Sequence, residues 1–144
     1  MSKQANWILS HSILLVLACV ISSCLGDYFG KPPEAFSLST PADKATEVSL
    51  TPNLVWSVAR EPTGWGSGGS GATVYDVGLK KSAEPDTTWI AQGISAINFQ
   101  IVAPLAPNTE YEWVVEARNS SLTGGTRAGP FTFTTTTTTT TVSQ

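Results

Sequence analysis

The chain has 144 residues and a formal net charge of −3, from 8 basic and 11 acidic side chains, with one His and two Cys. This length allows one ordinary domain, and the acidic balance provides no basic surface for nucleic acid. Charged residues make up only 13% of the chain, about half of the ~25% typical of soluble domains, which argues against an ordinary cytosolic surface.

The first twenty-four residues have the layout of an export signal. A short polar start with one Lys precedes nine uninterrupted apolar residues, 13–21, and small residues then lead to Cys24. The run Ile21-Ser22-Ser23-Cys24 resembles the lipobox of bacterial lipoproteins, in which the Cys is acylated and becomes the new N-terminus. The resemblance implies a signal peptide over residues 1–23, lipid attachment at Cys24 and, with Leu25 following, a location at the outer membrane or cell surface.

The sequence leaves three other interpretations of this segment. An uncleaved membrane helix would need about 20 apolar residues, and His11 with its Ser neighbours interrupts the longer window. A plain cleaved signal without lipid, or acylation at Cys19, also fits the pattern. Removal of residues 1–23 takes away the only His and leaves one Cys, so no disulfide can form within the remaining chain.

The rest of the chain predicts a tether followed by strands. Residues 24–33 contain Gly and a Pro pair, which mark irregular chain. Helical periodicity is then absent, and short alternating segments bounded by Pro, Gly and Asn indicate an all-β antiparallel sandwich. We expect seven strands, the first in two pieces: 35–39 with 47–50, 53–58, 73–80, 88–92, 96–102, 110–119 and 129–135.

Large apolar side chains alternate along these segments and define the expected core. The alternation places the following residues inward: Leu54, Trp56, Val58, Tyr75, Val77, Leu79, Phe99, Ile101, Tyr111, Trp113, Val115, Ala117, Phe131 and Phe133. Each of the aromatic side chains among them would bury about 150–250 Å². That area is suitable for a domain of about 100 residues without a disulfide.

Four motifs follow one another in this region. They are Asn53-Leu54-Val55-Trp56-Ser57, Tyr75-Asp76-Val77, Leu105-Ala106-Pro107-Asn108-Thr109-Glu110-Tyr111-Glu112-Trp113 and Gly129-Pro130-Phe131-Thr132-Phe133. Together they resemble a fibronectin type III domain of bacterial envelope proteins, a seven-stranded immunoglobulin-like antiparallel sandwich, over residues 34–135. The resemblance makes Trp56 the buried Trp of its strand. It also implies a tyrosine corner that begins at Leu105, in which Tyr111 hydrogen-bonds to upstream backbone.

The chain beyond the signal lacks the groups of familiar catalytic sites. Nucleophilic triads need an imidazole base and zinc sites draw on His and Cys, while the Gly-rich stretch 64–71 lacks the Lys of a phosphate loop. Glu110, Glu112 and Glu116 share one strand face, with near neighbours about 6.6 Å apart, a separation that inverting glycosidases use. We interpret them as a solvated face with weak cross-strand ion pairs, in which Lys80 lies near Glu110 or Glu112. We therefore expect no enzymatic activity, no cofactor and no metal.

Two tryptophans have no obvious core position. Trp65 lies in the Gly-rich stretch and Trp89 in the short strand 88–92. Each could contact a glycan or protein partner, or could be partly buried against a loop or sheet edge.

Residues 136–144 end the chain in a Thr-rich segment that we expect to be disordered, because it has no apolar face to bury. Taken together, these features predict a monomeric, lipid-anchored spacer or protein-interaction module of the bacterial cell envelope. Its partner would be the membrane, through acyl chains on Cys24, and an envelope protein or glycan. The alternatives are an adhesion or carbohydrate-binding module, and the N-terminal part of a longer multidomain envelope protein.

Overall fold

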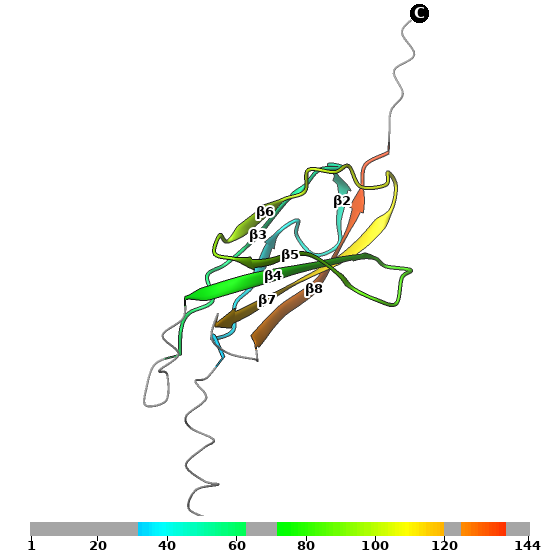
Figure 1. Cartoon of the computed structure of the whole chain (residues 1–144). Helices are drawn as coiled ribbons and strands as arrows, with labels where there is room; N and C mark the ends of the chain where they lie inside the picture. The colour runs from blue at the N-terminus through cyan, green and yellow to red at the C-terminus, as the bar shows by residue number, and fades with distance from the viewer. Residues whose placement is uncertain (1–31, 63–71, 120–124, 138–144) are drawn as a thin grey trace, which may run out of the picture.

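The computed structural model describes residues 32–62, 72–119 and 125–137, which form strands and no helix (Figure 1). No helix able to cross a membrane is therefore present in these ranges. The strands are β1 Leu38–Thr40, β2 Ala45–Val48, β3 Asn53–Trp56, β4 Thr73–Lys81, β5 Thr88–Ile94, β6 Asn98–Gln100, β7 Glu110–Asn119 and β8 Gly125–Thr135. The all-β prediction is confirmed.

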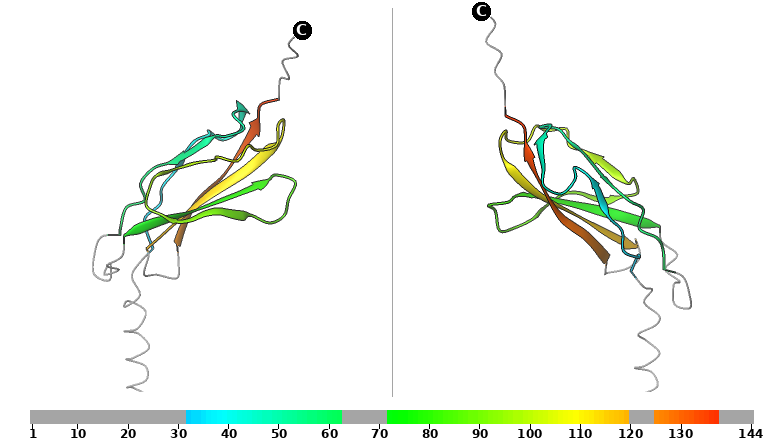
Figure 2. Two further views of the ribbon diagram at one scale, coloured as in Figure 1. Left: turned by 45° about the horizontal axis from the view of Figure 1, so that its top comes forward. Right: turned by 180° about the vertical axis from the view of Figure 1, so that it is seen from behind.

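The strands form two sheets that face each other (Figure 2). One has the order β1-β3-β6 and the other the order β2-β8-β7-β4-β5. The pairing between β2 and β8 is parallel and the other pairings are antiparallel. β4 and β7 pair without a register shift, from Thr73 opposite Asn119 to Lys81 opposite Tyr111. These two long strands make the regular centre of the larger sheet.

The described ranges contain eight strands and not the seven expected, because the two pieces of the first predicted strand belong to different sheets. Pro41, which follows β1, has no N–H to continue a ladder, and Lys44 has a φ of 61° that redirects the chain. Two hydrogen bonds of Thr132 fix the new direction of the chain. Its N–H donates to Asp43 Oδ1 at 3.0 Å, and its carbonyl accepts the N–H of Lys44 at 2.7 Å.

The expected inward position of Val58 is wrong, since 60% of that residue is exposed. β3 ends at Trp56, and alternation does not continue past the end of a strand. Ala59 is buried instead, and its N–H donates to the Tyr75 hydroxyl at 3.0 Å.

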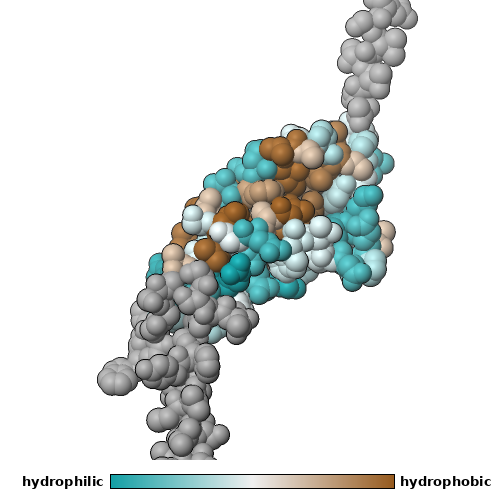
Figure 3. Space-filling view, viewed as in Figure 1, coloured by the Kyte–Doolittle hydropathy of each residue, from teal (hydrophilic) through white to brown (hydrophobic). Residues whose placement is uncertain are grey.

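Three other predicted boundaries also differ from the observed ones. The last strand begins at Gly125, four residues before the expected start, and β5 continues to Ile94. β6 is limited to three residues. Side chains of β5 are only partly buried against the core, and apolar surface is visible on the side of the molecule where β5 and β6 lie (Figure 3).

Aromatic rings fill the space between the two sheets. Trp56 and Trp113 are 1% and 0% exposed. The ring of Trp56 tilts against Tyr75 with 5.5 Å between centroids, and Trp113 meets Phe131 edge to face at 6.3 Å. Neither indole N–H has a hydrogen-bond acceptor in the described ranges, which costs about 1–3 kcal/mol for each group. The two positions therefore stabilise the fold through ring volume and not through hydrogen bonding.

Tyr111 closes one end of this core. Its hydroxyl accepts the N–H of Ala106 at 3.0 Å, and its ring stacks on Phe133 with centroids 5.7 Å apart. Leu105, at the start of the same turn, is partly buried against the core. This is the arrangement that the tyrosine-corner motif implies.

Replacing a buried indole should remove much of the stability of the domain. We expect Trp56→Ala and Trp113→Ala each to lower the free energy of unfolding by about 3–5 kcal/mol, measured by urea denaturation. Val58→Ala is the matched control, because a largely exposed side chain should change stability by less than about 0.5 kcal/mol. Equal midpoints for the Trp variants and the wild type would contradict the core assignment.

Candidate functional site

The outer face of the five-stranded sheet brings six charged side chains together. Alternate residues of β4, β7 and β8 point away from the core, and the strand register sets them side by side. They form three ion pairs: Asp76–Arg118 at 2.7 Å, Glu116–Arg127 at 3.2 Å and Lys80–Glu112 at 3.4 Å. The predicted pairing of Lys80 with this row of carboxylates is confirmed.

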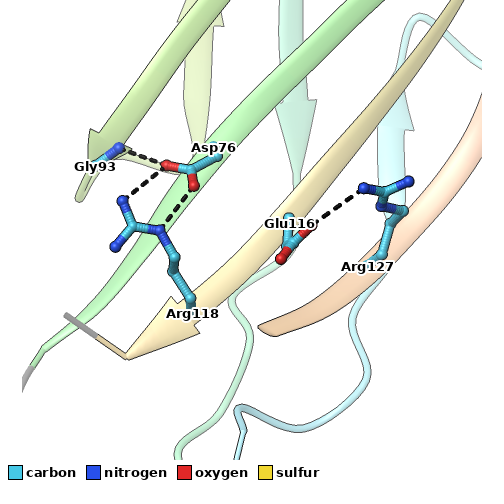
Figure 4. A network of polar contacts seen from close by, with 5 residues as sticks. All are labelled: Asp76, Gly93, Glu116, Arg118 and Arg127. Carbon is cyan, nitrogen blue, oxygen red and sulfur yellow. Dashed lines mark hydrogen bonds and ion pairs between the residues drawn. The ribbon is translucent and has the colours of Figure 1, made fainter. Parts of the chain in front are cut away.

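The strongest of the three pairs also holds the edge strand (Figure 4). Arg118 donates from Nε to Asp76 Oδ2 at 2.7 Å and from a terminal nitrogen to Oδ1 at 3.2 Å. The N–H of Gly93, which has a φ of 68°, donates to Asp76 Oδ1 at 2.7 Å. One carboxylate therefore connects β7, β4 and the irregular end of β5.

Both members of this pair are stabilised in their charged forms. Burial by itself raises the pKa of Asp76. The hydrogen bonds from Arg118 and Gly93, together with the positive charge of Arg118, outweigh burial and lower the pKa below its ordinary value of 3.8. The hydrogen bond to Asp76 likewise raises the pKa of Arg118. The pair is therefore ionised throughout the neutral pH range.

Trp89 lies on the same outer face and is half-buried. It is opposite Gly78, where an added Cβ would lie 3.3 Å from Cζ3 of the indole. That Cβ would also lie 2.6 Å from Thr87 Cγ2 and 2.9 Å from Val114 Cγ2. Val114 is 4% exposed although it does not belong to the main core, and Arg127 Cζ is 5.4 Å from the centre of the Trp89 ring. We call Gly78, Thr87, Trp89, Val114 and Arg127 the Trp89 cluster.

The structure places the other candidate residues as follows. Cys24, the signal segment 1–23 and Trp65 in the Gly-rich stretch lie outside the described residues. Glu110 is exposed, while Glu112 and Glu116 are occupied by the ion pairs described above. In the part of the chain that the structure describes, no group of acidic, His or Cys side chains is arranged to hold a metal.

Sequence reasoning missed how Trp89 is supported. A Gly inside a nine-residue strand was the available signal, because such a residue often marks a close approach of another group. Arg127 was missed as well, since it lies in residues 125–128, which were not expected to form part of the last strand.

Comparison with known proteins places these features in a family context. Residues 30–138 match the model of a family described as bacterial Ig-like domain. No curated protein matches at a significant level. The solved fibronectin type III domain of human fibronectin type III domain containing protein 3 is 17% identical with a TM-score of 0.56, over 80% of this chain and 96% of that one. An Fn3-like protein from Clostridium thermocellum is 23% identical with a TM-score of 0.44, over 76% and 97% of the two chains. The similarity to the human domain concerns the fold alone.

The Asp76–Arg118 pair should make stability depend on pH. The lowered pKa of Asp76 contributes stability that is complete above about pH 4 and is lost as the pH falls through the folded-state value. We expect Asp76→Asn to be less stable than the wild type by about 1–2 kcal/mol at neutral pH, with the difference narrowing in acid. Urea denaturation of both proteins, at pH values from neutral down to below the ordinary pKa of an Asp side chain, measures this difference in stability. Glu84→Gln, which breaks a more exposed pair with Lys81, is the control, and a difference independent of pH would contradict the assignment.

A methyl group at Gly78 should disturb the Trp89 cluster. We expect Gly78→Ala to lower the free energy of unfolding by about 1–3 kcal/mol through overpacking. Thr87→Ser removes the methyl group that lies 2.6 Å from the added Cβ. In thermal denaturation, Gly78→Ala should therefore cost less stability when it is added to Thr87→Ser than when it is added to the wild type. Wild-type stability in the single Gly78→Ala variant would show that this contact is not tight in solution.

Proposed function

Because the chain belongs to the bacterial Ig-like domain family, we propose that it is a non-catalytic, envelope-exposed spacer and interaction module, anchored by acyl chains on Cys24. The sandwich would hold its far end, and whatever binds there, at a fixed distance from a membrane. The sandwich fold itself is established, while the anchor, the location in the envelope and the absence of catalysis are parts of the proposal.

The observation that carries this proposal is that the described chain enters and leaves the sandwich at opposite ends (Figure 1). The Thr126 hydroxyl donates to the carbonyl of Pro33, which ties the entry to the start of β8. The chain leaves at Thr136, directly after the same strand. With about 3.3 Å per residue, the two ends are about 30 Å apart. A domain with this layout extends a chain along its own axis.

The exit from the sandwich is held firmly, as a spacer requires. The N–H of Thr136 donates to the carbonyl of Val48 at 2.8 Å, and the carbonyl of Thr136 accepts the N–H of Asn108 at 3.1 Å. The Thr135 hydroxyl donates to the carbonyl of Ala106 at 2.7 Å. Residues that follow Thr136 therefore start from a defined position and direction.

The edges of the sheets favour a monomer. β1 and β6 have three residues each, and β2 has four with a shifted register. β5 is longer, but its pairing with β4 contains two register shifts. Short and irregular edge strands oppose the addition of strands from another molecule. A single anchored copy is consistent with this arrangement.

The proposed anchor fits the length of chain before the sandwich. Residues 24–33 can span at most about 35 Å when fully extended, so the exit of the sandwich would lie within about 65 Å of the acylated Cys. Stable attachment needs more than one acyl chain, and three chains are what the lipobox resemblance implies.

Acyl labelling tests the anchor directly. The chain is expressed in a bacterial host that is fed an alkyne fatty acid, and labelled protein is followed through detergent phase partition. We expect the wild type and Cys19→Ala to be labelled and to enter the detergent phase, and Cys24→Ala to lose both properties. Label retained in Cys24→Ala, or lost only in Cys19→Ala, would contradict attachment at Cys24.

A further inference from the structure

We propose that the outer face of the five-stranded sheet at the Trp89 cluster binds an uncharged polysaccharide. The apolar face of a sugar ring would lie against the exposed part of the indole. Its hydroxyl groups would bond to Arg127 and to the neighbouring carboxylate of Glu116. Such binding rests on the interaction role proposed above, with the contact on a sheet face and not on the loops.

The surrounding residues hold the indole in a defined position. Gly78 leaves no room for a Cβ beneath it, and Val114, on the outer face, is buried to 4% exposure. Trp89 itself remains half-buried and lies at the edge strand, where a ligand can reach it. The sheet supports the ring at Gly78, and Arg127 lies over it, so a ligand here would contact the guanidinium group as well as the indole. A rigid aromatic surface of this kind provides contact area at little entropic cost.

The charges beside the Trp89 cluster are paired with one another. The six charged side chains around the Trp89 cluster form three pairs of opposite sign and carry no net charge between them. Glu110, at the start of β7, adds one exposed negative charge to the same face. An acidic or basic partner would have to break an existing pair to gain an attraction of its own. Asp76 and Arg118 are the hardest to separate, because both are shifted toward their charged forms. Charge complementarity therefore favours an uncharged partner.

Hydrogen-bond donors and acceptors lie beside the indole ring. The Arg127 side chain is 52% exposed, and its guanidinium group lies 5.4 Å from the centre of the Trp89 ring. One terminal nitrogen donates to Glu116 Oε2 at 3.2 Å, and a guanidinium group carries five N–H donors in all. Glu116 can accept further hydrogen bonds. Sugar hydroxyl groups both donate and accept, so they match this pairing of donors and acceptors beside an apolar ring.

A protein partner fits this face less well. The core of a protein interface gathers several aromatic and apolar residues and is depleted in charge, whereas one ring lies here among six charges. The large apolar side chains that are exposed in the described ranges lie elsewhere, next to the strands of the smaller sheet: Val58, Ile97 and Val102.

Native affinity electrophoresis of the complete chain tests the proposal. The gels contain hydroxyethylcellulose, xylan or glucomannan as neutral polysaccharides, and polygalacturonate as the acidic one. We expect at least one neutral polysaccharide to slow the protein and polygalacturonate to have no effect. Trp89→Ala should weaken binding by about tenfold or more, and Arg127→Ala by about threefold or more. No retardation by any neutral polysaccharide, or equal retardation by polygalacturonate, would overturn the proposal.

Three variants separate a lost contact from a lost fold. Trp89→Phe keeps an aromatic ring at this position and should retain most of the affinity. Val102→Ala alters a residue that is 82% exposed and lies away from the cluster, so it should bind as the wild type does. If Trp89→Ala fails to fold in urea denaturation, Arg127→Ala decides, and unchanged binding in that variant would overturn the proposal. Acyl labelling does not depend on this face, so failure of glycan binding is distinguishable from failure of the anchor.

Discussion

Aromatic packing holds the two sheets together. No disulfide can cross-link them, because the chain contains no Cys after residue 24. Trp56 and Trp113 lie between the sheets almost without exposure. The same strand that carries Trp113 inward presents Glu112 and Val114 outward. Any movement of this ring would therefore move the outer face as well. β7 contributes one face to the core and the other to the candidate binding face. Packing in the core therefore positions the side chains of the binding face.

Contacts on the outer face stabilise the five-stranded sheet in addition to the aromatic core. A Cβ added at Gly78 would meet both Trp89 and Val114, so the edge strand is closely packed there, and the Asp76–Arg118 pair reaches the same strand through the N–H of Gly93. These contacts explain how an irregular edge strand keeps its position. The charged side chains beside the Trp89 cluster are paired with one another, and this pairing favours an uncharged ligand.

Much of the fold could be predicted, because period-2 alternation records which face of a strand is buried. The inward position of Tyr111 followed from that pattern, and a pairing of Lys80 with Glu110 or Glu112 followed from the register it implies. The bond between the Tyr111 hydroxyl and the N–H of Ala106 was implied by the resemblance to a tyrosine corner. Alternation does not record where pairing stops, so Val58 was assigned to the core although β3 ends at Trp56. Alternation also does not predict that β1 and β2 belong to different sheets, or that β8 begins as early as Gly125. The Trp89 cluster depends on contacts among four strands, which no local pattern contains.

The parallel pairing of β2 with β8 has a mechanical consequence. Ala45 lies opposite Phe133 and Val48 opposite Thr135, and the N–H of Thr136 extends the contact to the carbonyl of Val48. Tension between the two ends of the domain would pull these neighbouring strands in opposite directions along their length. Their hydrogen bonds would then be sheared together and not opened one after another.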